Sequence, residues 1–283
     1  YDPTGECLPA GVPCDNHNHG THVTGIMVGE TADGSVQIGV APEAKWIAVK
    51  ACTGSGSCSR ANVIAAAQWL LAPTDVNGNN PRPDLRPDII NNSWGTGNYA
   101  DDPEFFRPLV QAWVAAGIFP VAAQGNLVSG CGHAFYPGLY PETMAVGSLT
   151  SAGLIAPTSN KGPSAVDGTI KPDIAAPGVG IYSSIKNSAY GTMSGTSMAA
   201  PHVSGAVALL WSYRPDLRGN ITFTRTLLGN SAPDVEDLTC GGTAASNNVY
   251  GMGKLNIFDA VRLSELKYKI ILILIMKNSS ITN

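Results

Sequence analysis

Short apolar runs alternate along this chain with helical patterns, and this alternation limits the fold more than any other feature. A strand that is apolar at every position must be covered on both faces, which is typical of parallel sheets between two helix layers. The predicted strands are Val36–Val40, Trp46–Ala51, Asp88–Asn92, Ile118–Ala122 and Met144–Leu149, and the predicted helices are Arg60–Leu71, Pro103–Ala116, Ser197–Tyr213 and Phe223–Leu228. We therefore expect an α/β fold of three α/β/α layers with a mostly parallel central sheet, whose ligand sites lie at the carboxyl ends of the strands.

The length of the chain favours one large domain. No break in composition divides residues 1–262, and abundant Gly (32) and Pro (20) indicate many ordered turns. From Lys267 onward the chain becomes rich in Lys, Ile and Asn, so we expect 263–283 to be an atypical tail outside the fold. Its apolar run Ile270–Met276 is far shorter than the roughly 20 residues that a membrane-spanning helix needs.

The charge of the chain argues against two classes of partner. The net charge is -4 and it comes without runs of like charge, so no basic face is available for a phosphate backbone or an anionic membrane. We therefore expect neither nucleic acid nor a membrane as a partner.

The cysteines and acidic loops bear on disulfides and metals. The six cysteines favour up to three disulfides outside the cytosol, and Cys52 and Cys58 could close a small loop, with free buried thiols as the less favoured alternative. Zinc is not expected, because no Cys-x-x-Cys pair occurs. The polar stretch Ala72–Pro87 lacks the bidentate Glu and flanking helices of an EF-hand, so a surface loop is favoured and no calcium site is evident.

The strongest chemical signal is the stretch Ser194–Val203, which reads Ser-Gly-Thr-Ser-Met-Ala-Ala-Pro-His-Val. Here a loop turns into a buried helix. With Thr196 near the N-cap, Ser197 lies at the helix start, where free N–H groups and the helix dipole can stabilise an oxyanion. Ser197 is therefore a candidate nucleophile, although an ordinary Ser/Thr cap with small packing residues would leave the same pattern.

A second motif, Asn18-His19-Gly20-Thr21-His22-Val23-Thr24-Gly25, supplies imidazole groups. A serine nucleophile needs a base within hydrogen-bond reach, and His19 or His22 could serve. As metal ligands the two histidines are unconvincing, because they lack the Glu of a His-Glu-x-x-His helix. Either histidine alone would more often be a packed core residue.

Together the two motifs resemble those of the subtilisin-like serine peptidases, the subtilases. The resemblance extends to Asn91–Gly95, Gly125-Asn126, Lys171–Gly178 and Asn248–Gly251, and it covers about residues 1–262. Details such as Ala72–Asp75 and Cys131-Gly132 look most like the bacillopeptidase F branch. The resemblance implies a serine endopeptidase that hydrolyses polypeptides through an acyl-enzyme, without a cofactor for the chemistry.

The resemblance also implies a role for individual residues. Ser197 would be the nucleophile, His19 the general base and Asn126 the oxyanion stabiliser, while His22 would be structural. Ser93, Trp94 and Gly95 would bind the substrate in extended form, and Ala122, Ala123 and Gly125 would line the primary pocket.

Some positions depart from the family pattern. Asn18 stands where Gly is usual before the catalytic histidine, and we expect it to be tolerated because Asn readily takes a left-handed backbone. Gln124 replaces the usual Ala before Gly125-Asn126, and Leu127-Val128 replaces small residues after it. These changes predict a bulkier and more apolar rim of the pocket.

The Asp-[Ser/Thr]-Gly motif that carries the triad's aspartate in this family is missing. Asp2-Pro3-Thr4-Gly5 only mimics it, because no strand precedes Asp2, and Asp15 belongs to a polar loop beside His19. We therefore expect a domain truncated at Tyr1, whose strand with the Asp, signal peptide and propeptide lie upstream, and whose activity is strongly impaired. Such a protein would be a secreted monomer.

Two other functions fit parts of the sequence. A pseudoprotease that binds extended peptides without cleaving them would explain the missing Asp and Gln124, but intact Ser197, His19 and Asn126 argue against it. A lipase or esterase would need Gly-x-Ser-x-Gly, whereas Thr196 and Met198 flank Ser197.

Overall fold

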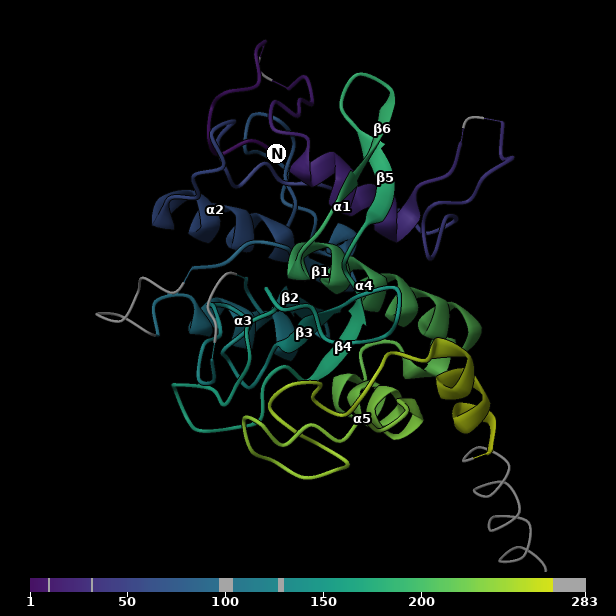
Figure 1. Ribbon diagram of the computed structural model, residues 1–283. Helices are drawn as coiled ribbons and strands as arrows, with labels where there is room; N and C mark the ends of the chain where they lie inside the picture. Colours follow the sequence, from purple (N-terminus) through teal and green to yellow (C-terminus); the bar gives the residue numbers. More distant parts are fainter. Residues whose placement is uncertain (10, 32, 97–103, 127–129, 267–283) are drawn as a thin grey trace, which may run out of the picture.

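The computed structural model describes residues 1–9, 11–31, 33–96, 104–126 and 130–266 (Figure 1). Its central sheet has four strands in the order β1-β2-β3-β4, and every neighbouring pair is parallel. The strands are β1 (Ile89–Asn92), β2 (Phe119–Ala123), β3 (Met144–Leu149) and β4 (Ile174–Pro177). All residues of β2 and β3 are buried, as their continuously apolar sequences predict.

Helices cover both faces of this sheet and complete the three expected layers. On one face, α2 (Arg60–Leu71) and α3 (Arg107–Ala115) bury Val63, Val110 and Trp113 against Ile90 of β1. On the other face lie α4 (Thr196–Tyr213) and α5 (Ile221–Ser231). They bury small and aliphatic side chains such as Ala199, Val203 and Leu227 against Val121 and Val146. The predicted α/β/α architecture is therefore confirmed.

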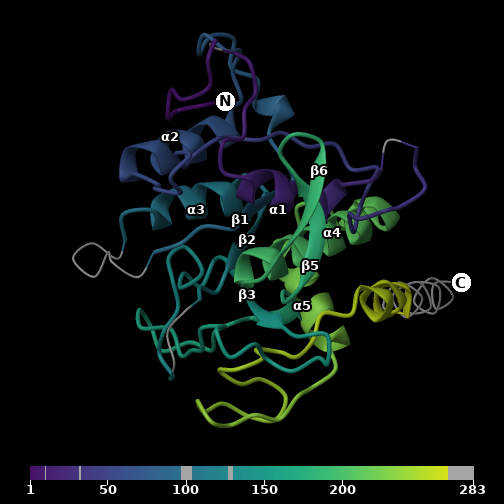
Figure 2. The ribbon, with the colours of Figure 1, turned by 45° about the horizontal axis from the view of Figure 1, so that its top comes forward.

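A helix and a hairpin add a further unit beside the start of α4. Helix α1 (His19–Val28) packs against the antiparallel hairpin of β5 (Ile181–Ile185) and β6 (Ala189–Met193), and Figures 1 and 2 show the two side by side. Val23 and Ile26 of α1 form a small apolar cluster with Met198 of α4. This cluster fixes α1 next to the residue that follows Ser197.

Two predicted strands are wrong. In Val36–Val40 only Gln37 makes a bridge, to Glu30, and Trp46–Ala51 pairs with no strand of the described chain. Trp46 is 60% exposed and Ile47 is 43% exposed. A strand needs a continuous ladder of hydrogen bonds as well as an apolar sequence. In the described residues these segments make only isolated backbone bonds, such as Lys50 N–H to the Tyr1 carbonyl at 2.9 Å and Val40 N–H to the Ile26 carbonyl at 2.9 Å.

Helix boundaries differ from the predictions at several places. Helix α3 begins at Arg107, with Pro108 in its first turn, and Pro103 lies outside the described residues. Two short 3-10 helices, η1 (Pro83–Leu85) and η2 (Pro215–Leu217), lie in connecting loops. None of the described helices is both long and apolar enough to cross a membrane.

The C-terminal boundary expected at residue 262 falls inside a helical segment, 257–266. Ser264 is buried, and its carbonyl accepts a hydrogen bond from Arg214 at 2.8 Å. Residues 263–266 therefore belong to the fold, and the rest of the expected tail lies outside the described residues.

All six cysteines are paired, as Cys7–Cys14, Cys52–Cys58 and Cys131–Cys240. The expected small loop between Cys52 and Cys58 is confirmed. Cys7–Cys14 closes a short N-terminal loop, and Cys131–Cys240 joins two segments that are 109 positions apart in the chain.

Candidate active site

The candidate site lies where the carboxyl ends of β1 and β2 meet the start of α4. Ser93 follows β1, Asn126 follows β2 by three positions, and Ser197 is the second residue of α4. This is the edge of a parallel sheet at which ligand sites are expected. The topology therefore brings together three of the residues that the sequence singled out.

The start of α4 leaves donor groups free around Ser197. Gly195 is the N-cap residue, with φ 148°, and the Thr196 N–H donates to Asn126 Oδ1 at 2.9 Å. The Ser197 N–H has no acceptor within the described chain, as is usual in the first turn of a helix. A Cβ on Gly195 would lie only 3.3 Å from Asn126 Nδ2, so the glycine lets the amide approach closely. These donors and the helix dipole favour a negative charge beside Ser197.

Asn126 is held by contacts that leave one donor available. Its Oδ1 accepts from the Thr196 N–H and, at 3.2 Å, from the Thr196 hydroxyl, which itself accepts from the Gly125 N–H at 3.1 Å. Asn126 Nδ2 donates to no group of the described residues, and the side chain is only half-buried. The free amide donor can therefore meet an oxyanion. The linking role of buried Thr196 was not predicted, because its partners are about 70 positions away.

Ser93 and Ser197 hold each other by reciprocal hydrogen bonds. The Ser93 hydroxyl donates to the Ser197 carbonyl at 2.7 Å, and the Ser197 hydroxyl donates to the Ser93 carbonyl at 3.1 Å. Asn91 supports this contact, since its Nδ2 donates to Ser93 Oγ at 2.8 Å and its Oδ1 accepts from Ser204 at 3.0 Å. A polar chain from α4 through β1 thus fixes the backbone of Ser197.

His19 is the first residue of α1, and its ring lies edge-on to that of His17. Val23, one turn further along, packs against Met198, the neighbour of Ser197. Asn18 before it has φ 79°, the left-handed conformation that the sequence predicted. The imidazole of His19 makes no hydrogen bond to Ser197, whose hydroxyl is directed at Ser93 instead.

The pKa of His19 is lowered below its usual value. Burial is the main cause, and the neighbouring His17 and His22 add to it. Below that pKa the ring would be charged and unable to accept a proton. The lowered pKa therefore keeps His19 in the neutral form that a general base requires.

His22 is buried and faces the hairpin. Its Nε2 donates to the carbonyls of Ile181 and Gly191, at 3.0 and 3.2 Å, and burial lowers its pKa. Two carbonyl partners require a proton on Nε2, which fixes the tautomer. His22 thus ties α1 to the hairpin.

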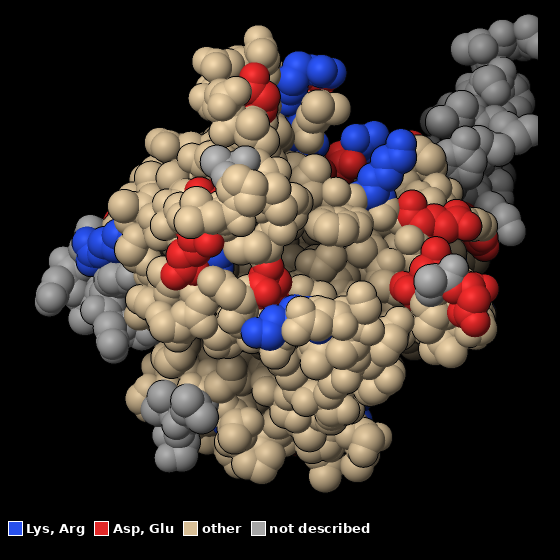
Figure 3. Space-filling view, turned by 90° about the horizontal axis from the view of Figure 1, so that it is seen from above, with Lys and Arg blue, Asp and Glu red and all other residues tan. Residues whose placement is uncertain are grey.

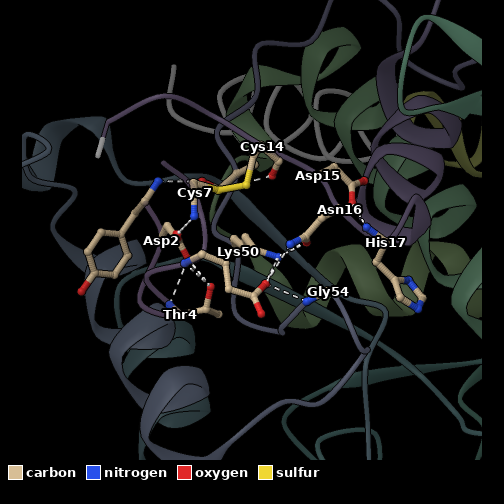
Figure 4. Close-up of a disulfide and its surroundings, with 12 residues drawn as sticks. Asp2, Thr4, Cys7, Cys14, Asp15, Asn16, His17, Lys50 and Gly54 are labelled. Atoms are coloured by element: carbon tan, nitrogen blue, oxygen red, sulfur yellow. Dashed lines mark hydrogen bonds and ion pairs between the residues drawn. A yellow bond between two sulfur atoms is a disulfide. The ribbon is translucent and has the colours of Figure 1, made fainter. Parts of the chain in front are cut away.

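Asp15 and Asp2, the two acidic residues considered from the sequence, do not hold the His19 ring. Burial would raise the pKa of Asp15, but hydrogen bonds from the Thr21 hydroxyl and from the backbone N–H groups of His17, Asn18 and Thr21 lower it to about 2. Asp2 accepts from Thr4 and Cys7 in its own turn (Figure 4). Within the described residues, no carboxylate is hydrogen-bonded to His19.

The residues expected to bind substrate lie along the same edge. Trp94 packs edge-on against Phe106 and donates from Nε1 to Asn92 at 3.2 Å, whereas Gly95 is exposed. Ala122, Ala123 and Gly125 are buried, as is Gln124. Both polar atoms of the Gln124 side chain are buried without a partner, so this residue forms no exposed rim, contrary to expectation. Leu127-Val128 lies outside the described residues.

Metal and surface features add little to this picture. The part of the chain that the structure describes contains no group of three or more His, Cys, Asp or Glu side chains that could hold a metal. In the loop 72–87, Asp75 accepts from the N–H groups of Asn77 and Asn79, so the loop closes on itself. On the face seen in Figure 3, acidic and basic side chains are scattered among uncharged ones.

Comparison with known proteins identifies the relatives of this chain. The chain is 45% identical to bacillopeptidase F of Bacillus subtilis (strain 168) over 254 residues, which is 88% of this chain and 17% of that protein. It is 36% identical to subtilisin E of the same strain over 226 residues, which is 77% of this chain and 53% of that protein. The chain therefore spans only a sixth to about half of the length of these relatives.

A solved structure and a family model agree with these relatives. The structure of the prenylagaramide maturation protease PagA superposes with a TM-score of 0.69 and is 27% identical, covering 90% of this chain and 83% of that one. The sequence model of the subtilase family matches residues 9–253. The chain with the Ser197 site therefore belongs to the subtilase family.

Proposed function

We propose that this chain is the catalytic domain of a serine endopeptidase that cleaves polypeptides through an acyl-enzyme on Ser197. One observation carries the proposal: Ser197 lies at the open start of α4, between the fixed Ser93 and the free amide of Asn126. Membership of the subtilase family supports the same reaction.

The reaction begins when the Ser197 hydroxyl leaves the Ser93 carbonyl and turns toward His19. Its oxygen attacks the scissile carbonyl while His19 takes its proton, and the new oxyanion is stabilised by Asn126 Nδ2 and the Ser197 N–H. His19 then donates the proton to the leaving amine, the peptide bond breaks and the acyl-enzyme remains. Water, deprotonated by His19, hydrolyses that ester and restores the Ser197 hydroxyl.

We propose that the chain 1–283 on its own performs this reaction slowly. Among the described residues, no carboxylate is hydrogen-bonded to His19. None therefore holds its ring in the tautomer that accepts the proton of Ser197. In subtilisin, a relative of this chain, loss of the triad Asp is known to lower kcat by about 3 × 10⁴-fold. Adding an upstream strand that ends in Asp-[Ser/Thr]-Gly is therefore expected to raise the rate of hydrolysis.

The test is hydrolysis of casein and of succinyl-peptide substrates by the chain 1–283, the extended chain and the extended chain with Ser197→Ala. Circular dichroism of each protein confirms folding. We expect the extended chain to be fastest and Ser197→Ala to abolish cleavage. If the folded chain 1–283 is as fast as the extended one, a residue within it must orient His19.

The second candidate is a protein that binds extended peptides without cleaving them. The Ser197 hydroxyl is directed at Ser93, and no carboxylate of the described residues is hydrogen-bonded to His19; both observations favour this candidate. It would predict peptide binding that Ser197→Ala leaves unchanged, with no cleavage by the extended chain.

The disulfides suggest where the protein works. Three pairs joined within one chain are typical of proteins from oxidising compartments, so we propose an exported, monomeric enzyme. Size-exclusion chromatography with light scattering tests the monomer.

A further inference from the structure

We propose that Asp15 is a positioning residue for the Ser197 reaction, because its carboxylate fixes the backbone on both sides of His19 and its charge stabilises the protonated ring. The inference rests on the proposed function, in which His19 takes the proton of Ser197. Asp15 acts here through the backbone and the field at His19, and not as the hydrogen-bonded partner of its ring.

Both oxygens of the Asp15 carboxylate accept hydrogen bonds from the segment that contains His19. Oδ1 accepts from the N–H groups of His17 and Asn18 at 2.9 and 3.0 Å, and Figure 4 shows the bond to His17. Oδ2 accepts from the N–H and the hydroxyl of Thr21 at 2.9 and 2.6 Å. These partners lie before and after His19 in the chain, so one side chain holds both ends of the turn that carries His19.

These bonds replace the usual cap of helix α1. Asn18 is the N-cap residue, yet its side chain makes no capping hydrogen bond, and its backbone has the left-handed φ of 79°. Thr21 is the third residue of α1, whose N–H a capping side chain normally binds. Asp15 binds that N–H instead, and it also holds the N–H of Asn18 in a conformation that residues other than Gly rarely adopt. The direction in which α1 starts at His19 therefore depends on Asp15.

The charge of Asp15 also acts on His19. Burial would raise the pKa of Asp15, but its hydrogen bonds lower it to about 2, so the carboxylate is ionised wherever His19 titrates. Burial and the neighbouring His17 and His22 lower the pKa of His19, whereas the charge of Asp15 raises it. Because transfer of the Ser197 proton turns the His19 ring into a cation, a fixed negative charge nearby stabilises the product of that step.

The loop that carries Asp15 is anchored independently of the carboxylate. Asn16, the next residue, accepts at Oδ1 from Lys50 at 2.7 Å (Figure 4). Its Nδ2 donates at 3.0 Å to Glu6, which also accepts from the Gly54 N–H at 2.7 Å. Substitution of Asp15 therefore leaves the loop attached and changes mainly the start of α1.

Two substitutions divide the effects of Asp15. Asp15→Ala removes all four hydrogen bonds, so the His19 ring loses its fixed position, and we expect the limiting rate of labelling at Ser197 to fall on the order of 10- to 100-fold. Asp15→Asn keeps an acceptor for His17 and Asn18 and loses the charge, so a smaller fall is expected. In both variants the pH midpoint of labelling should move down, since the pKa of His19 falls when the negative charge is removed.

The experiment follows labelling of the chain 1–283 by a fluorophosphonate, over a series of probe concentrations and pH values, with intact mass as the readout. The proteins are the parent chain, Ser197→Ala, Asp15→Ala, Asp15→Asn and the matched control Asp33→Ala, and urea midpoints show that each is folded. Asp33 is exposed beyond the other end of α1, and hydrogen bonds from Thr31 and Ser35 lower its pKa to about 2 as well.

We expect Asp33→Ala to label at the parent rate, and both Asp15 variants to show a lower limiting rate with an unchanged half-saturating probe concentration. If Asp15→Ala does not fold, Asp15→Asn decides the question. Folded Asp15 variants that keep either the limiting rate or the pH midpoint of the parent would overturn the inference alone, because a residue that only stabilises α1 predicts that result. No Ser197-dependent labelling of the parent would overturn the proposed function, and this inference with it.

Discussion

The Asn126 side chain performs two tasks that substitution can separate. Its Oδ1 accepts from the N–H and hydroxyl of Thr196 at the start of α4, while its Nδ2 is free to stabilise an oxyanion. Asn126→Asp keeps an acceptor for Thr196 and removes the donor. Asn126→Ala removes both groups.

The two losses have different magnitudes. Removing one oxyanion donor lowers kcat by about 10²–10³-fold, or about 2.7–4 kcal/mol, as is known for subtilisin, a relative of this chain. Removing a helix cap lowers the free energy of unfolding by about 1 kcal/mol. We therefore expect both variants to lose reactivity but only Asn126→Ala to lose stability, since a carboxylate at a helix N-terminus is favourable.

The assay measures the rate of fluorophosphonate labelling and the urea midpoint of each variant. Asn220 offers a matched control, because its side chain caps α5 by accepting from the Phe223 N–H at 3.1 Å, away from the site. Asn220→Ala should lose stability and keep its labelling rate. An Asn126→Asp variant that labels as fast as the parent chain would refute the role of Nδ2.

Other predictions concern pH, a buried ion pair and a disulfide. Burial lowers the pKa of His19 below 6.5, and only the neutral ring accepts a proton. The rate of fluorophosphonate labelling should therefore rise with pH, and the midpoint of that rise should lie below pH 6.5. A midpoint above about pH 7 would contradict this. Lys171 is 1% exposed and donates from Nζ to Asp173 at 2.7 Å and to the Tyr140 and Thr143 carbonyls at 3.0 Å, while Arg225 also pairs with Asp173. Lys171→Met leaves two buried carbonyls without a donor but keeps the Arg225 pair, so it should lower the free energy of unfolding by about 1–3 kcal/mol in urea titrations; an unchanged free energy would contradict this. The disulfide Cys131–Cys240 spans 109 positions, so in the loop-entropy model its removal should lower the free energy of unfolding by about 5 kcal/mol, more than removal of Cys7–Cys14. Equal losses for the two disulfides in the same titrations would contradict the model.

The parts of the fold that were predicted correctly carry a strong local signal. Strand β3 and helix α2 have the predicted bounds, and α4 begins one residue early, because continuous apolar runs and a Ser cap fix them locally. The segment Trp46–Ala51 has the same apolar signal but lacks a partner strand, so the prediction failed. Pairing depends on distant residues that periodicity does not reveal.

Helix α1 and the hairpin were missed for a different reason. The sequence of α1, rich in Gly, Thr and His, has weak helical propensity and is stabilised by Asp15 at its start and by packing against the hairpin. Strand β6 is largely exposed and lacks an apolar pattern. In both elements tertiary contacts outweigh local preference.

The candidate site was predictable only where a motif is contiguous. Ser197 and His19 stand in short, specific motifs, whereas the contacts that hold the site join Thr196 to Gly125 and Asn91 to Ser204, across 71 and 113 positions. No spacing rule reaches across such distances. The fold supplies these contacts after the motifs have named the reactive groups.

The most direct test of Ser197 as a nucleophile is its labelling by a fluorophosphonate, followed by peptide mapping of the modified chain. We predict one modified residue, Ser197, with labelling abolished in Ser197→Ala and slowed in His19→Ala. Folded chain that takes up no label during long incubation, or labelling that persists in Ser197→Ala, would contradict the assignment of Ser197 as the nucleophile.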